Sequence, residues 1–251
     1  MAEAQGFSVV AFDAVASTND LCLERARDGA DRLWIVAQSQ TGGRGRRGRG
    51  WSSPPGNLYA SLLLVDPAPM TVAAQIGFVA ALALHDAVAG LLPAPALAAL
   101  KLKWPNDLLL AGAKLSGILV EATTLAAGRT AVVVGIGVNI VAGAAEAPYA
   151  TTHLSRHMGA SAGDPGALLF AALSDAMARR LAQWDRGAGF AATRADWLAR
   201  AAGLGGAVRV ETMGAPIVGV LRTMDASGRL VVDCADGHAR LVEAGDVFLT
   251  A

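Results

Sequence analysis

The chain has 251 residues, of which 53% are hydrophobic and only 17% charged, so it can bury a large core and is not disordered. It carries 21 basic and 21 acidic residues, and this zero net charge excludes a protein that binds polyanions over its whole surface. Cys22 and Cys234 lie far apart, without the spacing of a metal site or a disulfide framework, which is typical of a reducing cytoplasm.

The first hundred residues read as strands and helices in alternation. We expect three strands and two helices, at residues 7–13, 17–29, 33–40, 57–65 and 71–92. Gln75, His85 and Asp86 interrupt the apolar run of the last helix, so we interpret it as a buried helix and expect no membrane span. The N-terminus has no basic region followed by an apolar stretch, so we expect a soluble, cytoplasmic protein without a signal peptide.

In the second part of the chain, the pattern of predicted elements changes near Gly203. Before this point, the pattern predicts a three-strand meander and two helices, at residues 100–110, 113–124, 130–140, 165–185 and 190–203. After it, short strand-like runs alternate with turn signals, which favours a small β-barrel of about five strands. We therefore expect a catalytic domain over residues 1–203 and a second domain over residues 204–251.

The stretch GGRGRRGRGW, from Gly42 to Trp51, concentrates four arginines on flexible backbone. Glycines let the backbone approach an anion closely, arginines donate paired hydrogen bonds to phosphate or carboxylate, and a tryptophan offers a face for a base. These properties predict a loop that closes over an anionic nucleotide. A solvated basic loop, or an arginine–glycine segment that binds RNA, is also compatible with these residues, so this stretch alone does not identify the ligand.

A second group of polar residues follows in KWPNDLLL and KLSGILVE. A Pro-Asn-Asp turn should project Lys103, Asn106 and Asp107 at a strand end, with Lys114 on the neighbouring strand and an open space at Gly117. Lysines can neutralise two anions that must be joined, and a carboxylate can hold Mg²⁺ or receive a proton. The alternative is that both lysines are exposed strand residues and that the turn has no chemical role.

With STN at residues 17–19 and GIGVNI at residues 135–140, these motifs resemble the biotin protein ligases in both order and approximate spacing. The resemblance extends from about Ser17 to the C-terminus. It implies an α+β fold, in which a mixed sheet with flanking helices like that of class II aminoacyl-tRNA synthetases precedes an SH3-like C-terminal barrel. Only about sixteen residues precede STN, so we expect the monofunctional type without an N-terminal DNA-binding domain.

The resemblance also implies roles for individual residues. The implied biotin-binding residues are Ser17, Thr18, Asn19, Gln40, Gly43, Arg44, Gly45, Arg46, Lys114 and Gly117. The implied ATP-binding residues are Arg47, Arg49, Trp51, Lys103, Asn106, Asp107 and Asn139. Lys114, Arg46 and Asp107 would be catalytic, and Asp107 would hold Mg²⁺, while its role as a base stays open. The chain ends in DVFLTA, where well-known relatives place a basic residue, so the part of the C-terminal domain in ATP binding also stays open.

The implied activity is an ATP-dependent ligation in two steps. Biotin and MgATP would give biotinyl-5′-AMP, and a lysine of a biotin carboxyl carrier protein would then receive the biotinyl group. We expect no specific DNA and no membrane as partners, and both a monomer and a homodimer stay open. The alternatives are a ligase for lipoate or octanoate on the same fold, whose glycine and lysine signatures differ from these, and a nonenzymatic RNA-binding module.

Overall fold

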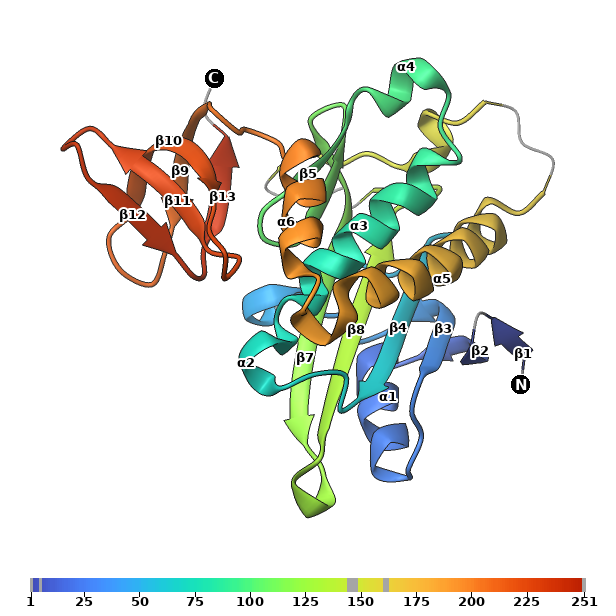
Figure 1. The fold of residues 1–251 in the computed structure, drawn as a ribbon. Coiled ribbons are helices and arrows are strands. Elements are labelled where there is room, and N and C mark those ends of the chain that lie inside the picture. The colour runs from blue at the N-terminus through green and yellow to red at the C-terminus, as the bar shows by residue number, and fades with distance from the viewer. Residues whose placement is uncertain (1, 5, 144–148, 160–162, 250–251) are drawn as a thin grey trace.

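The structure, a computed structural model, describes residues 2–4, 6–143, 149–159 and 163–249, which form two sheets and a set of helices (Figure 1). The larger sheet has the strand order β1-β2-β3-β4-β8-β7-β6-β5. Only β2 and β3 are parallel within it, and every other neighbouring pair is antiparallel. The bounds of these strands are β1 Ala2–Ala4, β2 Phe7–Val15, β3 Leu33–Gln40, β4 Leu58–Val65, β5 Leu100–Lys103, β6 Asp107–Leu110, β7 Ala113–Thr124 and β8 Thr130–Val138.

Helices lie on both faces of this sheet. The crossover helix α1, Thr18–Arg27, connects the parallel strands β2 and β3 and packs on one face. On the other face α3 packs against the sheet, and α5 and α6 pack against α3 (Figure 1). The remaining bounds are α2 Met70–Ala73, α3 Ile76–Ala89, α4 Ala94–Leu97, α5 Pro165–Trp184 and α6 Phe190–Ala199, with 3₁₀ turns at Arg46–Gly48, Ala126–Gly128, Leu154–Arg156 and Asp185–Gly187.

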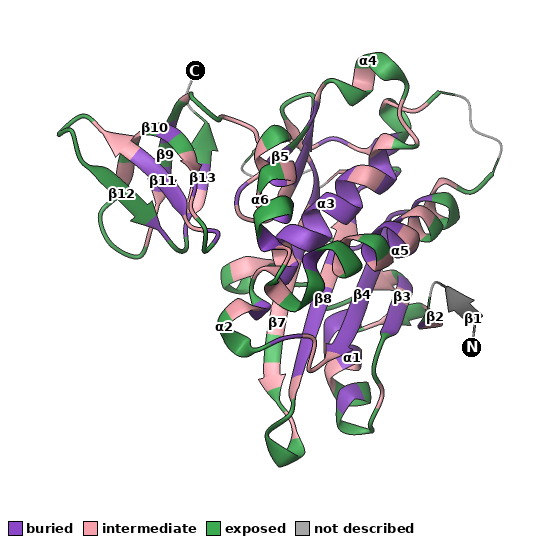
Figure 2. Ribbon diagram, viewed as in Figure 1, coloured by how far each residue is buried: buried purple, intermediate pink, exposed green. Residues whose placement is uncertain are grey.

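Strand alternation divides the core between these two faces. Ile35, Leu63 and Val133 pack with Cys22 of α1, whereas their chain neighbours Trp34, Leu62, Val132 and Val134 pack in the larger cluster that includes α3. Because successive side chains of a strand point to opposite faces, a central strand buried on both sides must be apolar throughout. Figure 2 shows this burial along β3, β4 and β8 and on the inner side of α3.

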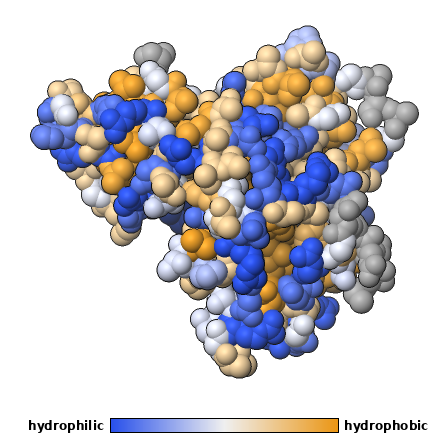
Figure 3. Space-filling model, viewed as in Figure 1, coloured by the Kyte–Doolittle hydropathy of each residue, from blue (hydrophilic) through white to orange (hydrophobic). Residues whose placement is uncertain are grey.

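The apolar segment that the sequence predicts at residues 71–92 is helical but shorter. It consists of α2 and α3, which are joined by Ala74 and Gln75, both with helical backbone angles. The segment ends before Pro93. Met70–Ala89 is long and apolar enough to cross a membrane, yet 72% of its most apolar window is buried within the protein. Apart from His85 and Asp86, the helix is apolar on nearly all sides, as expected of a helix that the sheet, α5 and α6 all cover. Hydrophilic residues lie among apolar ones on the surface over this region (Figure 3).

The C-terminal sheet contains five antiparallel strands in the order β12-β11-β10-β9-β13. Their bounds are β9 Ala207–Glu211, β10 Ile217–Met224, β11 Leu230–Cys234, β12 Ala239–Val242 and β13 Asp246–Leu249. The sheet is held to the larger body by specific contacts, such as the hydrogen bond of 3.1 Å that the Trp104 indole Nε1 donates to the carbonyl of Gly228. The α+β fold predicted from the sequence is confirmed, and the C-terminal part forms the expected five strands.

Candidate active site

A cavity of about 320 Å³ opens where the larger sheet, the arginine loop (residues 42–51) and β13 meet. Most of the predicted residues line it: Ser17, Thr18, Asn19, Gln40, Arg44, Gly45, Arg46, Arg49, Trp51, Lys103, Asn106, Asp107, Lys114 and Gly117. The first four are uncharged, whereas Lys103 and Lys114 lie beside Asp107 and Arg46 and Arg49 lie beside Asp246, so the cavity has an uncharged end and a cationic end. A volume of this size suits a small-molecule ligand.

The uncharged end is built on the N-terminus of α1. Ser17 caps this helix, since its hydroxyl accepts a hydrogen bond of 3.3 Å from the backbone N–H of Asp20. Gln40, at the end of β3, accepts hydrogen bonds from the backbone N–H of Thr18 at 2.9 Å and from its hydroxyl at 3.1 Å. The amide of Gln40 donates in turn to Ser53 at 3.1 Å. These groups therefore hold one another in place before any ligand arrives.

Two residues that sequence reasoning missed complete this network. Asn19 donates from Nδ2 to the carboxylate of Glu121 at 2.6 Å, and Ser61 contacts both Asn19 Oδ1 at 2.5 Å and Thr18 Oγ1 at 2.7 Å. Because a carboxylate only accepts hydrogen bonds, Glu121 fixes which way the amide of Asn19 points. Ser61 is fully buried in β4, and nothing in its strand-like sequence context separates it from an ordinary core position.

Bare backbone forms the floor between the two ends. Gly117 of β7 and Gly137 of β8 are paired across the sheet, and the indole of Trp51 lies over both. A Cβ atom at Gly137 would lie 2.5 Å from Trp51 Nε1, and one at Gly117 would lie 3.2 Å from the Trp51 ring. A Cβ at Gly135, two residues before Gly137, would clash with the Asn19 side chain. Only glycine leaves room for Trp51 and Asn19 at these places.

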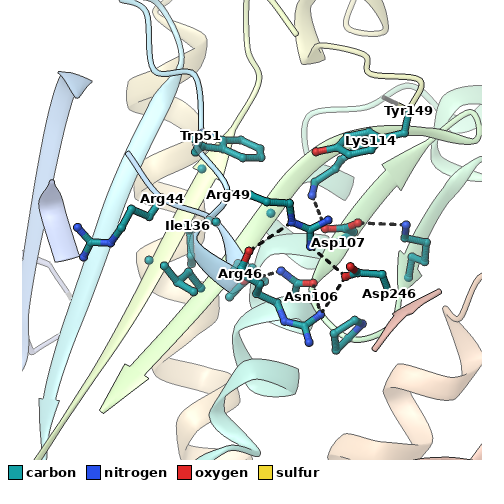
Figure 4. Close-up of a pocket in the computed structure, with 18 of the residues that line it drawn as sticks. Arg44, Arg46, Arg49, Trp51, Asn106, Asp107, Lys114, Ile136, Tyr149 and Asp246 are labelled. Carbon is teal, nitrogen blue, oxygen red and sulfur yellow. Dashed lines mark hydrogen bonds and ion pairs between the residues drawn. The ribbon is translucent and has the colours of Figure 1, made fainter. Parts of the chain in front are cut away.

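The cationic end centres on Asp107, whose side chain is only 10% exposed. Lys114 Nζ lies 2.6 Å from Asp107 Oδ1, and Lys103 Nζ lies 3.2 Å from Oδ2. The Lys114 ammonium also lies 5.5 Å from the ring centre of Trp51 and 5.2 Å from that of Tyr149, within the range of cation–π attraction. Figure 4 shows both rings near this lysine. Tyr149 was not predicted, because its surroundings read only as a loop.

Arg46 reaches the same end of the cavity from the loop. Its guanidinium donates to the carbonyl of Gly245 at 3.1 Å and contacts Asn106 Oδ1 at 3.4 Å. Burial lowers the pKa of Arg46, and the carboxylate of Asp246 acts in the opposite direction. Asp246, at the start of β13, is an acidic neighbour of Arg46 that sequence reasoning missed. The C-terminal sheet does contribute to the cavity, through Asp246 and the following residues of β13.

Arg44 points away from this group (Figure 4). Its guanidinium forms two hydrogen bonds with Asp20, of 2.8 and 2.5 Å, and lies 3.6 Å from Glu121. The hydrogen bond from Arg44 holds the pKa of the Asp20 carboxyl below its usual value. In this structure Arg44 therefore braces the uncharged end and does not lie beside Lys114.

Three predicted residues do not line the cavity: Gly43, Arg47 and Asn139. Gly43 accepts a backbone hydrogen bond of 2.9 Å from Trp51, and a Cβ atom there would lie 2.6 Å from Ser53 Oγ and from the carbonyl of Trp51. It therefore allows the base of the loop to close. Asn139 is buried and donates to the carbonyl of Thr152 at 3.1 Å, which is a structural contact beside the site.

The residues around Asp107 do not form a protein-held metal site. Both of its carboxylate oxygens are engaged by lysines, and the described part of the chain contains no group of three His, Cys, Asp or Glu side chains with metal-binding geometry. A divalent cation prefers several oxygen ligands without adjacent ammonium groups. This end of the cavity therefore suits a divalent cation that is already coordinated by oxygen atoms of a bound ligand.

Known proteins share both the sequence and the fold. The profile of the Biotin/lipoate A/B protein ligase family matches residues 11–139, and that of the Biotin protein ligase C terminal domain matches residues 203–250. Biotin–[acetyl-CoA-carboxylase] ligase of Paracoccus denitrificans is 44% identical over 92% of this chain and 96% of its own length. The enzyme of that name from Mycobacterium tuberculosis is 38% identical over 92% of this chain and 85% of its own. The structure of biotin protein ligase from Aquifex aeolicus in complex with biotin and ATP superposes with a TM-score of 0.79, at 25% identity, over 97% of this chain and 98% of that one.

Proposed function

The chain belongs to the Biotin/lipoate A/B protein ligase family, and from this premise we propose that its cavity activates biotin with ATP and transfers the biotinyl group to a lysine of a biotin carboxyl carrier protein. The relatives that match most of the chain carry the name of a biotin ligase, which supports biotin over lipoate or octanoate. The family assignment replaces the reading of the arginine loop as a nonenzymatic RNA-binding module.

One observation carries the proposal: a single cavity joins an uncharged, hydrogen-bonding end to a cationic end. Biotin has the matching polarity, with a neutral ureido ring at one end and a carboxylate at the other. Ser17, Thr18, Asn19 and Gln40 offer donors and acceptors to the ring. The bare backbone at Gly117 and Gly137, which Trp51 covers in this structure, lies between the two ends, and the acyl chain would cross it to deliver the carboxylate to Lys114.

The first step joins two anions and needs local positive charge. The carboxylate oxygen of biotin attacks the α-phosphorus of MgATP, the bond from that phosphorus to the bridging oxygen breaks, and pyrophosphate leaves with the electron pair. Lys114 and Arg46 neutralise the carboxylate and the α-phosphate as they approach each other. A fixed charge aimed at a developing anion contributes about 10²–10³ in rate in comparable sites.

The second step uses the mixed anhydride formed by the first. The neutral ε-amine of the carrier lysine attacks the acyl carbon, the bond between that carbon and the phosphate oxygen breaks, and AMP leaves. The amine loses a proton as the amide forms. Asp107, whose carboxylate lies 2.6 Å from Lys114 Nζ, is the best candidate to stabilise the positive charge that forms on the attacking nitrogen before its proton passes to solvent.

The anhydride also reacts with water, which gives the arginine loop a reason to be mobile. A loop that closes after both ligands enter keeps the intermediate dry until the carrier lysine reaches it. Trp51 Nε1 is buried and has no hydrogen-bond partner among the described residues, so it has a donor available for the nucleotide. Mg²⁺ enters this scheme as part of MgATP, bound to phosphate oxygens and not to a cluster of protein carboxylates.

The test is exchange of labelled pyrophosphate into ATP, measured with biotin, lipoate and octanoate in parallel. We expect exchange with biotin and background rates with the other two acids. Exchange with lipoate or octanoate instead would assign a different acid to the same fold. Absence of exchange with all three acids, from folded protein supplied with Mg²⁺, would overturn adenylation itself.

A further inference from the structure

The first residue of β13 makes all of its ion pairs, among the described residues, with the arginine loop. Asp246 Oδ1 lies 2.9 Å from Arg49 Nη2 and 3.8 Å from Arg46 Nη1, and Oδ2 lies 3.3 Å from Arg47 Nη1. The backbone adds a fourth contact, since Arg46 also donates to the carbonyl of Gly245. In Figure 4, Asp246 faces Arg46 and Arg49 across the cationic end of the cavity.

The carboxylate of Asp246 reduces the repulsion between the arginines of the ligand-free loop. Three guanidinium groups lie within 3.8 Å of one carboxylate and would repel one another without it. The Asp246 side chain is 23% exposed, so solvent screens these charges only in part. Burial lowers the pKa of Arg46 and the charge of Asp246 opposes that effect, as expected of a counter-ion.

The strand register shows why the carboxylate lies there. Asp246 pairs with Glu211 at the end of β9, while the following residue, Val247, is buried and pairs with Val210. Val247 thus anchors the strand in the C-terminal sheet, and Asp246 is left to project from the sheet edge towards the loop. The carboxylate makes none of its ion pairs within its own sheet, and all three are with arginines of the loop in the larger domain.

We propose that Asp246 is a positioning residue for adenylation: it takes the place of a phosphate in the ligand-free enzyme, holds Arg46, Arg47 and Arg49 together, and releases them to the phosphates of ATP. This inference rests on the proposed function. Guanidinium groups bind phosphate and carboxylate with the same paired donors, so the nucleotide can replace Asp246 without rebuilding the loop. Because the loop is already ordered around Asp246, ATP binding loses less conformational entropy in ordering it.

The direct experiment is limited trypsin digestion of the ligand-free protein, because trypsin cleaves after arginine and the loop contains four. We expect Asp246→Asn to speed cleavage within residues 44–49, identified by mass spectrometry, by about 3–10-fold. Asp233→Asn is the matched control, because Asp233 pairs with Arg222 at 3.3 Å in the same sheet but outside the cavity. Cleavage of Asp246→Asn at the wild-type rate overturns the proposal, whatever acid the enzyme activates.

A second experiment separates positioning from a general effect on the fold. We expect Asp246→Asn to raise the KM for ATP about 3–10-fold in pyrophosphate exchange, with kcat and the KM for biotin within twofold. In an Arg49→Gln background the same substitution should raise the KM for ATP by a smaller factor, because the shortest of the three ion pairs of Asp246 is already lost. A lowered or unchanged KM for ATP in the single variant overturns the proposal, as does an equal effect in both backgrounds.

Discussion

The two ends of the cavity are built in opposite ways. At the uncharged end Thr18 and Asn19 are 4–5% exposed and are fixed by short hydrogen bonds to Gln40, Ser61 and Glu121 of the sheet. At the cationic end the side chains of Arg46 and Arg49 are 20% and 54% exposed, and they are held by ion pairs. Neutral hydrogen bonds in a dry site are rigid, whereas partly exposed ion pairs exchange partners at little cost.

This difference teaches which half of the site recognises and which half reacts. The uncharged end is preformed, so it can discriminate between acids by shape and by hydrogen bonding. The cationic end has temporary partners in Asp107 and Asp246, so it can accept incoming anions in their place. Substitutions at the two ends should therefore affect different kinetic parameters.

The largest effect is expected at the cationic end. Lys114→Ala removes the ammonium group that lies beside Asp107, and we expect it to slow biotin-dependent pyrophosphate exchange by about 10²–10³-fold. Lys101→Ala is the matched control, because Lys101 is an exposed lysine on β5, at the edge of the same sheet. Exchange at the wild-type rate in Lys114→Ala would remove this lysine from the chemistry.

A smaller effect on a different parameter is expected at the uncharged end. Ser61→Ala removes a buried donor from Asn19 Oδ1, and such a loss costs about 1–3 kcal/mol. We expect the KM for biotin to rise about tenfold and the KM for ATP to stay within twofold of wild type. Ser39→Ala, which removes a hydroxyl from the exposed side of β3, is the control. An equal rise in both KM values would mean that the two ends are not separate.

The smallest effect on catalysis is expected from a charged cluster outside the site. Burial raises the pKa of Asp86, but the neighbouring His85, Arg180 and Arg200 outweigh it, so the pKa lies below its usual value of 3.8. A carboxyl with a lowered pKa in the folded state stabilises the fold above its unfolded pKa, and this contribution is lost as pH falls through the folded pKa.

We therefore expect Asp86→Asn to destabilise the protein at pH 7 by about 1–2 kcal/mol, with pyrophosphate exchange unchanged. The difference in unfolding free energy from wild type should shrink as the pH falls below about 4 and through the lowered pKa of Asp86. Denaturant unfolding across this pH range provides the measurement, with Asp28→Asn at the exposed end of α1 as control. A difference that is constant with pH would show that the charge of Asp86 contributes nothing.

Much of this molecule could be predicted from local sequence patterns. The strands, the apolar helix and the change near Gly203 follow from periodicity and turn residues, and the motifs around Arg46, Asp107 and Lys114 identify the cationic end. What was missed depends on contacts between distant segments. Asp246 is about 200 residues from the loop that it contacts, and only the docking of the C-terminal sheet brings the two together.

Residues with an ordinary local pattern were missed for another reason. Ser61 lies in a run of strand residues, and Glu121 ends the strand motif KLSGILVE without a signal of its own. Their roles depend on which face of the sheet lies over α1, which a single sequence does not reveal. The orientation of Arg44 depends equally on a distant segment, because it is set by Asp20 in the first turn of α1.

Helix α3 also has a consequence for synthesis on the ribosome. It is apolar on nearly all sides, and its partners α5 and α6 lie at Pro165–Trp184 and Phe190–Ala199, far downstream. At about 5–20 residues per second, roughly 4–20 seconds separate the emergence of α3 from that of the helices that cover it. During this interval the nascent chain exposes a segment that could bind a chaperone or aggregate. Slow translation between residues 90 and 165 should therefore lower the yield of folded protein more than slow translation after residue 200.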